Sequence, residues 1–216
     1  MPTVDMHVHL PVPEWLEGAL GTYLASAERF FRTKVTARPM EDLASEYEKL
    51  DMVGVLLAWD AETATGLPPL SNELVASIVK RFPGRFVGFG SVDPHRPDAS
   101  ERVQQIPNLG LLGLKLHPTI QAFDPSSDHA MRLVEVAAEA GLAVITHTGT
   151  SGLGAGCPGG LGLRIDFARP ILLERAAAAF PDMPIVLAHV GWPWHLEALA
   201  MALHKTNVSI DVSGCR

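Results

Sequence analysis

The chain has 216 residues with a formal net charge of −7, and 47% of its residues are hydrophobic while 19% are charged. This composition is typical of a soluble globular protein and argues against intrinsic disorder. Lysine and arginine are scattered singly, apart from one adjacent pair, so there is no basic stripe for nucleic acid, and we expect a small-molecule substrate instead.

No stretch approaches the ~20 consecutive apolar residues of a membrane span. Acidic residues and histidines interrupt the N-terminal segment, where a signal peptide would need an apolar core. The two cysteines, Cys157 and Cys215, lie far apart and indicate neither a disulfide framework nor a structural zinc module. We therefore expect a cytoplasmic protein with no membrane partner.

Short apolar segments alternate with longer helical patterns from the N-terminus onward, which is typical of βαβ units that form a parallel sheet. The predicted strands are residues 3–10, 53–58, 86–92, 113–117, 143–147, 184–189 and 207–212. The predicted helices are residues 14–31, 40–50, 69–81, 128–140, 167–179 and 194–204, and Asp128 is the expected N-cap of its helix. This order predicts an α/β protein with a TIM-barrel-like (β/α)₈ fold, incomplete with about seven strands, and a helical insertion after the first strand.

Residues 149–162 are rich in glycine and predict a loop that is long enough to be mobile. The loop contains the pattern G-x-G-x-x-G at Gly154, Gly156 and Gly159, but Pro158 interrupts the pattern and no helix is predicted directly after it. A dinucleotide site needs such a helix, so we do not expect one here.

Five histidines lie at or near the ends of predicted strands. They are His7, His9, His117, His147 and His189. The first two are two residues apart in one strand and therefore project to the same face, which Asp5 should share. Parallel strands have a common carboxyl edge, where barrel enzymes place their catalytic groups, so we expect all five imidazoles to gather there. Neutral imidazole is a good ligand for zinc and similar divalent ions.

Other interpretations remain for single residues. A histidine at the end of one strand can simply hydrogen bond within the core, and this applies most to His117, which we otherwise expect to contact substrate. Lys115 shares the face of His117 and could bind an anionic substrate group, bridge two metals as a carbamate, or form a structural ion pair. Trp192 could pack on a substrate ring or in the core. The remaining histidines are expected on the surface.

Four segments carry a family resemblance: VDMHVHL, GLKLHPTIQAFDP, ITHTGTSG and IVLAHVGWPW, in this order. They resemble the amidohydrolase-related family, which includes the aminocarboxymuconate-semialdehyde decarboxylases and the resorcylate-type decarboxylases. The resemblance covers essentially the whole chain. It implies one divalent metal, usually Zn²⁺, bound by His7, His9 and His147, with His189 beside it as the catalytic general acid/base.

The family's remaining metal ligand is an aspartate at the end of the eighth strand, in a segment resembling FGTD, and this sequence has no counterpart. Asp211 lies inside the seventh predicted strand and is assigned no role. Because the sequence stops at Arg216, we expect residues 1–216 to form a single amidohydrolase-type (β/α) barrel domain that lacks its C-terminal unit or units. Two open sheet edges would then favour pairing between chains, so a homo-oligomer is a candidate state.

Three functions are consistent with these features. The first is metal-dependent hydrolysis, in which activated water attacks the carbonyl of an ester, amide, lactone or β-ketoacyl group in a small substrate. An aromatic compound is one candidate for that substrate. The alternative is non-oxidative, metal-dependent decarboxylation. The His-x-His motif does not separate these two, because the muconate-semialdehyde decarboxylases also have it. The third is a catalytically weak, metal-binding scaffold, which the missing eighth-strand aspartate favours.

Overall fold

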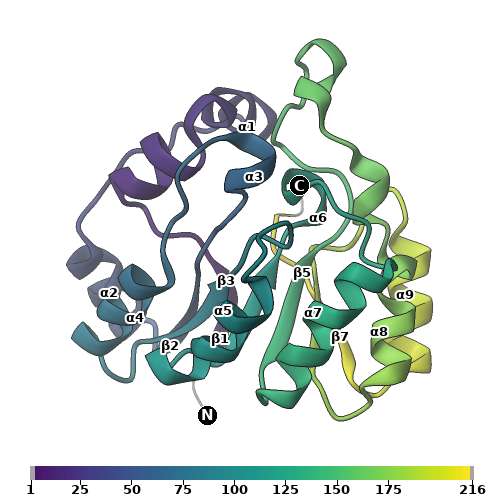
Figure 1. The fold of residues 1–216 in the computed structure, drawn as a ribbon. Helices are drawn as coiled ribbons and strands as arrows, with labels where there is room; N and C mark the ends of the chain where they lie inside the picture. The colour runs from purple at the N-terminus through teal and green to yellow at the C-terminus, as the bar shows by residue number, and fades with distance from the viewer. Residues whose placement is uncertain (1–2, 215–216) are drawn as a thin grey trace.

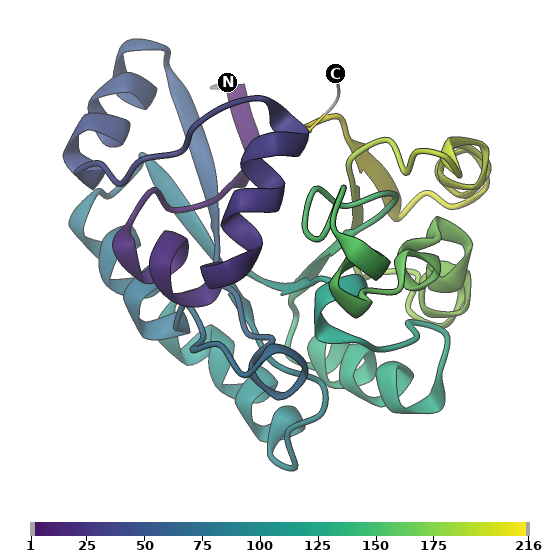
Figure 2. The ribbon, with the colours of Figure 1, turned by 90° about the horizontal axis from the view of Figure 1, so that it is seen from above.

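All seven strands of the protein belong to one parallel sheet in the order of the sequence, in a computed structural model that describes residues 3–214. The strands are β1 (Thr3–Val8), β2 (Met52–Leu57), β3 (Phe86–Ser91), β4 (Gly113–Leu116), β5 (Ala143–His147), β6 (Ile185–Ala188) and β7 (Val208–Asp211). Each predicted strand is confirmed to within two residues at either end. Seen from above, the sheet curves from β1 to β7 with helices outside it (Figure 2). This is the predicted incomplete, TIM-barrel-like fold.

The strands are buried on both faces, as continuous apolar runs predict. Side chains on the outer face, such as Leu56, Val144 and Leu187, pack with the surrounding helices. Alternate side chains fill the inside of the barrel, where Val55, Leu57, Phe89, Ile145, Val186 and Ala188 form a second cluster. The inner cluster supports the carboxyl edge from below, and the candidate site lies above it.

Most of the α-helices cover the outside of the sheet (Figure 1): α2 (Met40–Lys49), α4 (Asn72–Arg81), α5 (Ala99–Gln105), α7 (Asp128–Glu139), α8 (Glu174–Ala179) and α9 (His195–His204). The others, α1 (Leu24–Phe31), α3 (Glu62–Thr65) and α6 (Pro118–Gln121), lie at the carboxyl ends of the strands. The predictions for α2, α4, α7 and α9 are confirmed. The structure corrects the N-cap of α7, because Ser127 and not Asp128 accepts the hydrogen bond from the backbone N–H of Ala130.

Two predicted helices are interrupted. Residues 14–31 form a π-helix (Glu14–Ala19), a 3₁₀ turn (Gly21–Tyr23) and then α1, because Gly21 has a φ of 46° that an α-helix cannot contain. Residues 167–179 become α-helical only in α8. Pro170 lacks a backbone N–H and holds the preceding Arg169 in an extended conformation, so two 3₁₀ turns come first.

The insertion after β1 lies at the carboxyl end of the strands, as predicted, and α1 stands above the sheet in Figure 1. The glycine-rich loop contacts this insertion, since the backbone N–H of Gly154 donates to Ser26 Oγ at 2.8 Å. No helix within residues 3–214 is long and apolar enough to cross a membrane. Cys157 is a free thiol, and Cys215 lies outside the described residues.

Candidate metal centre

The end of β1 presents two histidines to the inside of the barrel. The Nε2 atoms of His7 and His9 lie 3.3 Å apart, so the two rings meet as the His-x-His spacing predicts. The predicted position of Asp5 on the same face is wrong. The register between β1 and β2 shifts between Asp5 and Val8, and this irregularity resets the alternation of faces. Asp5 therefore accepts a hydrogen bond from Tyr47 of α2, outside the sheet, at 2.6 Å.

The other three histidines of the set come from β4, β5 and β6. His147 is the last residue of β5, and His117 and His189 directly follow β4 and β6. The ring of His147 stacks on His117 with 3.9 Å between centroids and meets the ring of His189 at 4.9 Å. His189 in turn lies 4.8 Å from His7. The structure thus brings all five imidazoles into one continuous cluster.

Two of the five rings have their tautomers fixed by oxygen acceptors. The Nδ1 atom of His189 donates to the backbone carbonyl of Ser213 at 2.8 Å. The Nδ1 atom of His7 donates to the Oδ2 atom of Asp211 at 2.9 Å. Because neither acceptor carries a proton to give, the Nε2 atoms of both rings keep their lone pairs available inside the cluster.

Asp211 is the site residue that the sequence argument missed. It is the last residue of β7, and its carboxylate also accepts hydrogen bonds from the backbone N–H and the hydroxyl of Ser213, at 2.7 and 2.8 Å. Burial alone would raise the pKa of Asp211, but the hydrogen bonds from His7 and Ser213 outweigh burial and lower it to about 2. Its position at a strand end, like that of His147, was the available signal.

Burial keeps the cluster uncharged. It lowers the pKa of His7 to about 3, and it lowers the pKa of His9, His117, His147 and His189 as well, with the nearby charge of Lys115 acting in the same direction. Neutral imidazole is the form that binds metal. The electrostatics of the site therefore hold the donors in their ligating state near neutral pH.

The residues fit a divalent metal. Among the described residues, the buried Nε2 atom of His147 has no hydrogen-bond partner. An unsatisfied buried polar atom is costly, and a metal would satisfy it. When two nitrogens bind one tetrahedral zinc ion, each at a Zn–N distance of about 2.05 Å, they lie about 3.3 Å from each other. The Nε2 atoms of His7 and His9 have this separation. Among the described residues, the grouping of three whose ligand atoms all lie within 4.8 Å of one another is His7, His189 and Asp211, and it includes neither His9 nor His147.

A cavity of about 240 Å³ opens above the histidines, lined by all five of them and by apolar residues of the insertion. Trp15 forms part of its wall and stacks on His9 with 4.6 Å between ring centroids and an interplanar angle of 9°. A second cavity of about 330 Å³ also reaches His147 and His189, and Thr148 and Trp192 line it too. It shares Phe31 and Gly152 with the first cavity.

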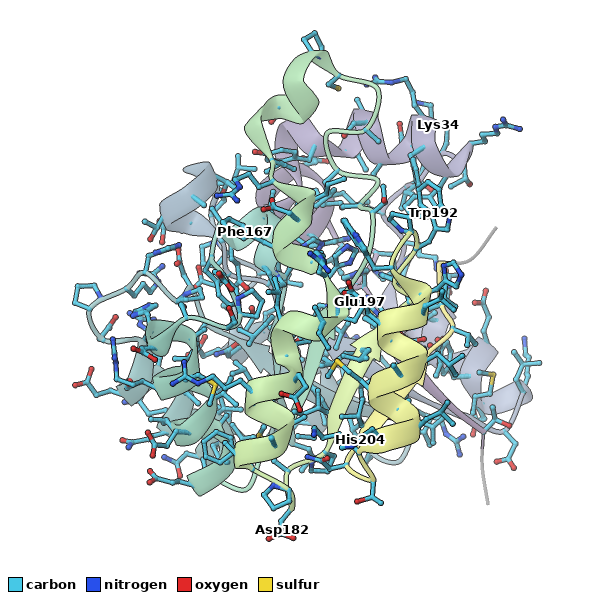
Figure 3. All side chains as sticks on the ribbon, turned by 90° about the vertical axis from the view of Figure 1, so that its right-hand side faces the viewer. Lys34, Phe167, Asp182, Trp192, Glu197 and His204 are labelled. Carbon is cyan, nitrogen blue, oxygen red and sulfur yellow. The ribbon has the colours of Figure 1, made fainter. Side chains whose placement is uncertain are left out.

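The three predicted substrate contacts differ in position. His117 lines the first cavity, whereas Trp192 lines the second and is 62% exposed. Figure 3 shows Trp192 at the same end of the molecule as Lys34 and far from Asp182. Lys115 is only 1% exposed, lines neither cavity, and places its Nζ atom 3.5 Å from Nε2 of His7, below the histidines. Burial lowers the pKa of Lys115 to about 7.

The histidines outside the cluster lie on the surface, as predicted. They are His95, His129, His195 and His204. The fold and the site together define a TIM-barrel-like protein with a histidine-rich candidate metal centre at the carboxyl ends of its strands.

Comparison with known proteins agrees with this class. The family model described as amidohydrolase matches residues 4–216, so the chain belongs to the amidohydrolase family. No curated protein matches the sequence significantly.

Several solved structures have the same fold. An uncharacterized TIM-barrel protein from Bordetella bronchiseptica is 22% identical with a TM-score of 0.75, and the match covers 98% of this chain and 75% of that one. A probable 2-pyrone-4,6-dicarboxylic acid hydrolase from Acinetobacter baumannii is 14% identical with a TM-score of 0.62, covering 99% and 71%. A 5-carboxyvanillate decarboxylase from Novosphingobium aromaticivorans with bound manganese is 17% identical with a TM-score of 0.63, covering 94% and 68%.

Proposed function

We propose that this amidohydrolase is a metal-dependent hydrolase that cleaves an ester, amide, lactone or β-ketoacyl compound of small size. Its divalent metal, in our proposal one Zn²⁺, is held by His7, His9 and His147. Two observations carry the proposal: the Nε2 atoms of His7 and His9 lie 3.3 Å apart, and the buried Nε2 atom of His147 has no partner among the described residues. A bound divalent metal would polarise the substrate carbonyl and lower the pKa of water.

The remaining polar residues have supporting roles in this proposal. Asp211 accepts the Nδ1 hydrogen of His7 and so keeps the Nε2 lone pair of that ring directed into the cluster. Carboxylate partners of this kind orient metal-binding histidines and raise their basicity. Ser213 does the same for His189 through its backbone carbonyl, so the Nε2 atom of His189 is available as a proton acceptor.

Decarboxylation is the second candidate. Its support is the shared fold with a 5-carboxyvanillate decarboxylase that binds manganese, a metal that this site could also hold. The state of His189 favours hydrolysis. Burial lowers the pKa of His189, so the ring is neutral and can accept a proton from water at Nε2, whereas decarboxylation needs an acid that protonates carbon.

The two reactions are separated by their products. We would incubate the zinc-loaded and manganese-loaded protein with phenyl acetate and with 2,6-dihydroxybenzoate, and measure phenol and CO₂. The proposal expects phenol release that is lost in the His147→Ala variant and in metal-free protein. Release of CO₂ without phenol would favour the decarboxylase, and a metal-loaded protein without either product would favour the scaffold.

A further inference from the structure

The cavity above the histidines contains almost no charge. Among the described residues that line it, Glu28 is the only one with a formal charge at neutral pH once the neutral histidines are set aside. The wall away from the histidines is built mostly from apolar side chains of the insertion and of the glycine-rich loop, such as Leu16, Leu20, Leu24, Phe31 and Leu153. Its polar members, Thr33 and Ser151, are uncharged.

Glu28 is already paired within the protein. Its carboxylate accepts hydrogen bonds from Lys34 Nζ at 2.6 Å and from the backbone N–H of Val35 at 3.0 Å. A cationic substrate group would have to compete with both donors.

Apart from Lys115, which lies beneath the histidines, the cations nearest to the cavity are on its outside. Arg29, Arg32 and Lys34 line a neighbouring depression that shares Glu28 and Thr33 with the cavity, and none of the three lines the cavity itself. A carboxylate at the far end of a substrate would therefore lose its hydration without meeting a positive partner, which is strongly unfavourable. An apolar group would gain from the same burial.

The size and shape of the cavity suit one ring. An apolar cavity of ~150 Å³ lined by aliphatic and aromatic side chains holds benzene, and this one has about 240 Å³. Trp15 and Trp59 meet edge to face at 4.8 Å between centroids, so two aromatic surfaces at right angles bound the space beside His9. Aromatic substrates pack well against such surfaces.

We propose that the group of the substrate farthest from the histidines is uncharged and apolar, about the size of one ring with a short substituent. The inference rests on the proposed function, and it narrows the substrate class to neutral aryl or alkyl carbonyl compounds. The apolar wall excludes a substrate that has a carboxylate at its far end.

The test compares two probes that differ only at the far end: benzohydroxamate and 4-carboxybenzohydroxamate. Their dissociation constants are measured by calorimetry with metal-free and with zinc-loaded protein. We expect the uncharged probe to bind at least tenfold more tightly in both forms. Equal binding, or tighter binding of the carboxylated probe, would overturn the inference. A gain in affinity on addition of zinc tests the proposed function separately, because the ratio of the two dissociation constants does not depend on whether zinc is bound.

A charge introduced into the wall should change the preference. Ala27 is half-buried on α1 and lines the cavity, so Ala27→Lys supplies the missing cation while Ala27→Met adds similar bulk without charge. We expect Ala27→Lys to shift the ratio of the two dissociation constants at least tenfold in favour of the carboxylated probe. Ala27→Met should still bind the uncharged probe more tightly. An unchanged ratio in Ala27→Lys would contradict the inference. If that variant does not fold, Val35→Lys at the 40% exposed rim replaces it.

Discussion

The Nδ1 atom of His7 lies 2.9 Å from the Oδ2 atom of Asp211, and this hydrogen bond joins residues that are 204 positions apart in sequence. It connects the first strand of the sheet to the seventh, although β1 pairs only with β2, and β7 only with β6, within residues 3–214. The contact therefore closes the site on the side where the sheet itself is open. It also adds a carboxylate to a site for which the sequence predicts only histidines as metal ligands.

Removal of the Asp211 carboxylate should weaken metal binding. In Asp211→Ala the ring of His7 loses the partner that fixes its tautomer, and we expect the affinity for Zn²⁺ to fall about 10- to 100-fold. The measurement is competition with a chromophoric chelator. Asp182→Ala is the control, because Asp182 is exposed at the opposite end of the molecule (Figure 3). Equal affinity in both variants would show that Asp211 has no role in the metal centre.

The metal-free protein should lose stability in acid. The folded-state pKa of His7 is about 3 against 6.5 for the free side chain, so the unfolded state takes up the proton first. The stability from this neutral histidine is fully present above pH 6.5 and is lost as the pH falls from 6.5 toward 3. Between pH 7.5 and pH 5, His7 alone should lower the free energy of unfolding by about 2 kcal/mol. The other four histidines act in the same direction. Urea unfolding at the two pH values measures this loss, and a flat profile would contradict it.

Lys115 should destabilise the metal-free protein in the neutral to alkaline range. Its pKa falls from 10.5 to about 7 on folding, so the stability of the wild type rises as the pH increases from 7 to 10.5. Lys115→Met removes the buried amine, and we expect a gain of about 3 kcal/mol in the free energy of unfolding at pH 8. The dependence of stability on pH above 7 should become weaker in the same variant. A loss of stability at pH 8 would mean that the ammonium group has a partner that compensates for its burial.

Gly149 should tolerate no side chain. It has a φ of 85°, and a Cβ atom would lie 2.7 Å from the backbone of Gly191 and Trp192, which cannot move aside as a side chain could. We expect Gly149→Ala to lower the free energy of unfolding by more than about 2 kcal/mol. Gly156→Ala is the matched control, since Gly156 has a φ of 71° with nothing within 4 Å, and should cost about 1 kcal/mol. Similar losses in urea unfolding would contradict the steric explanation.

The strands and the histidine cluster could be predicted from the sequence because both depend on local patterns. Continuous apolar runs mark strands that are buried on both faces, and parallel strands bring their carboxyl ends together whatever the loops do. The ends of β5 and β6 placed His147 and His189 without any knowledge of tertiary contacts. The short helices α3 and α6, of four residues each, could not be predicted because they contain too little periodicity.

The features that escaped prediction depend on contacts between distant parts of the chain. The irregularity of β1 arises from its register with β2, and it moved Asp5 to the outer face where Tyr47 binds it. The role of Asp211 depends on how far the sheet curves toward β1. The sequence near Asp5 gives no sign of the irregularity, and the position of Asp211 at a strand end does not show that His7 lies beside it.

The metal content of the purified protein tests the central claim most directly. After equilibration with Zn²⁺ and exhaustive dialysis, elemental analysis should find about one zinc ion per chain in the wild type and in His95→Ala, whose histidine is exposed and outside the cluster. The His7→Ala and His147→Ala variants should retain much less. A wild-type chain that retains no zinc, manganese or other divalent ion, or equal retention in all four proteins, would contradict the assignment of the histidine cluster as a metal centre.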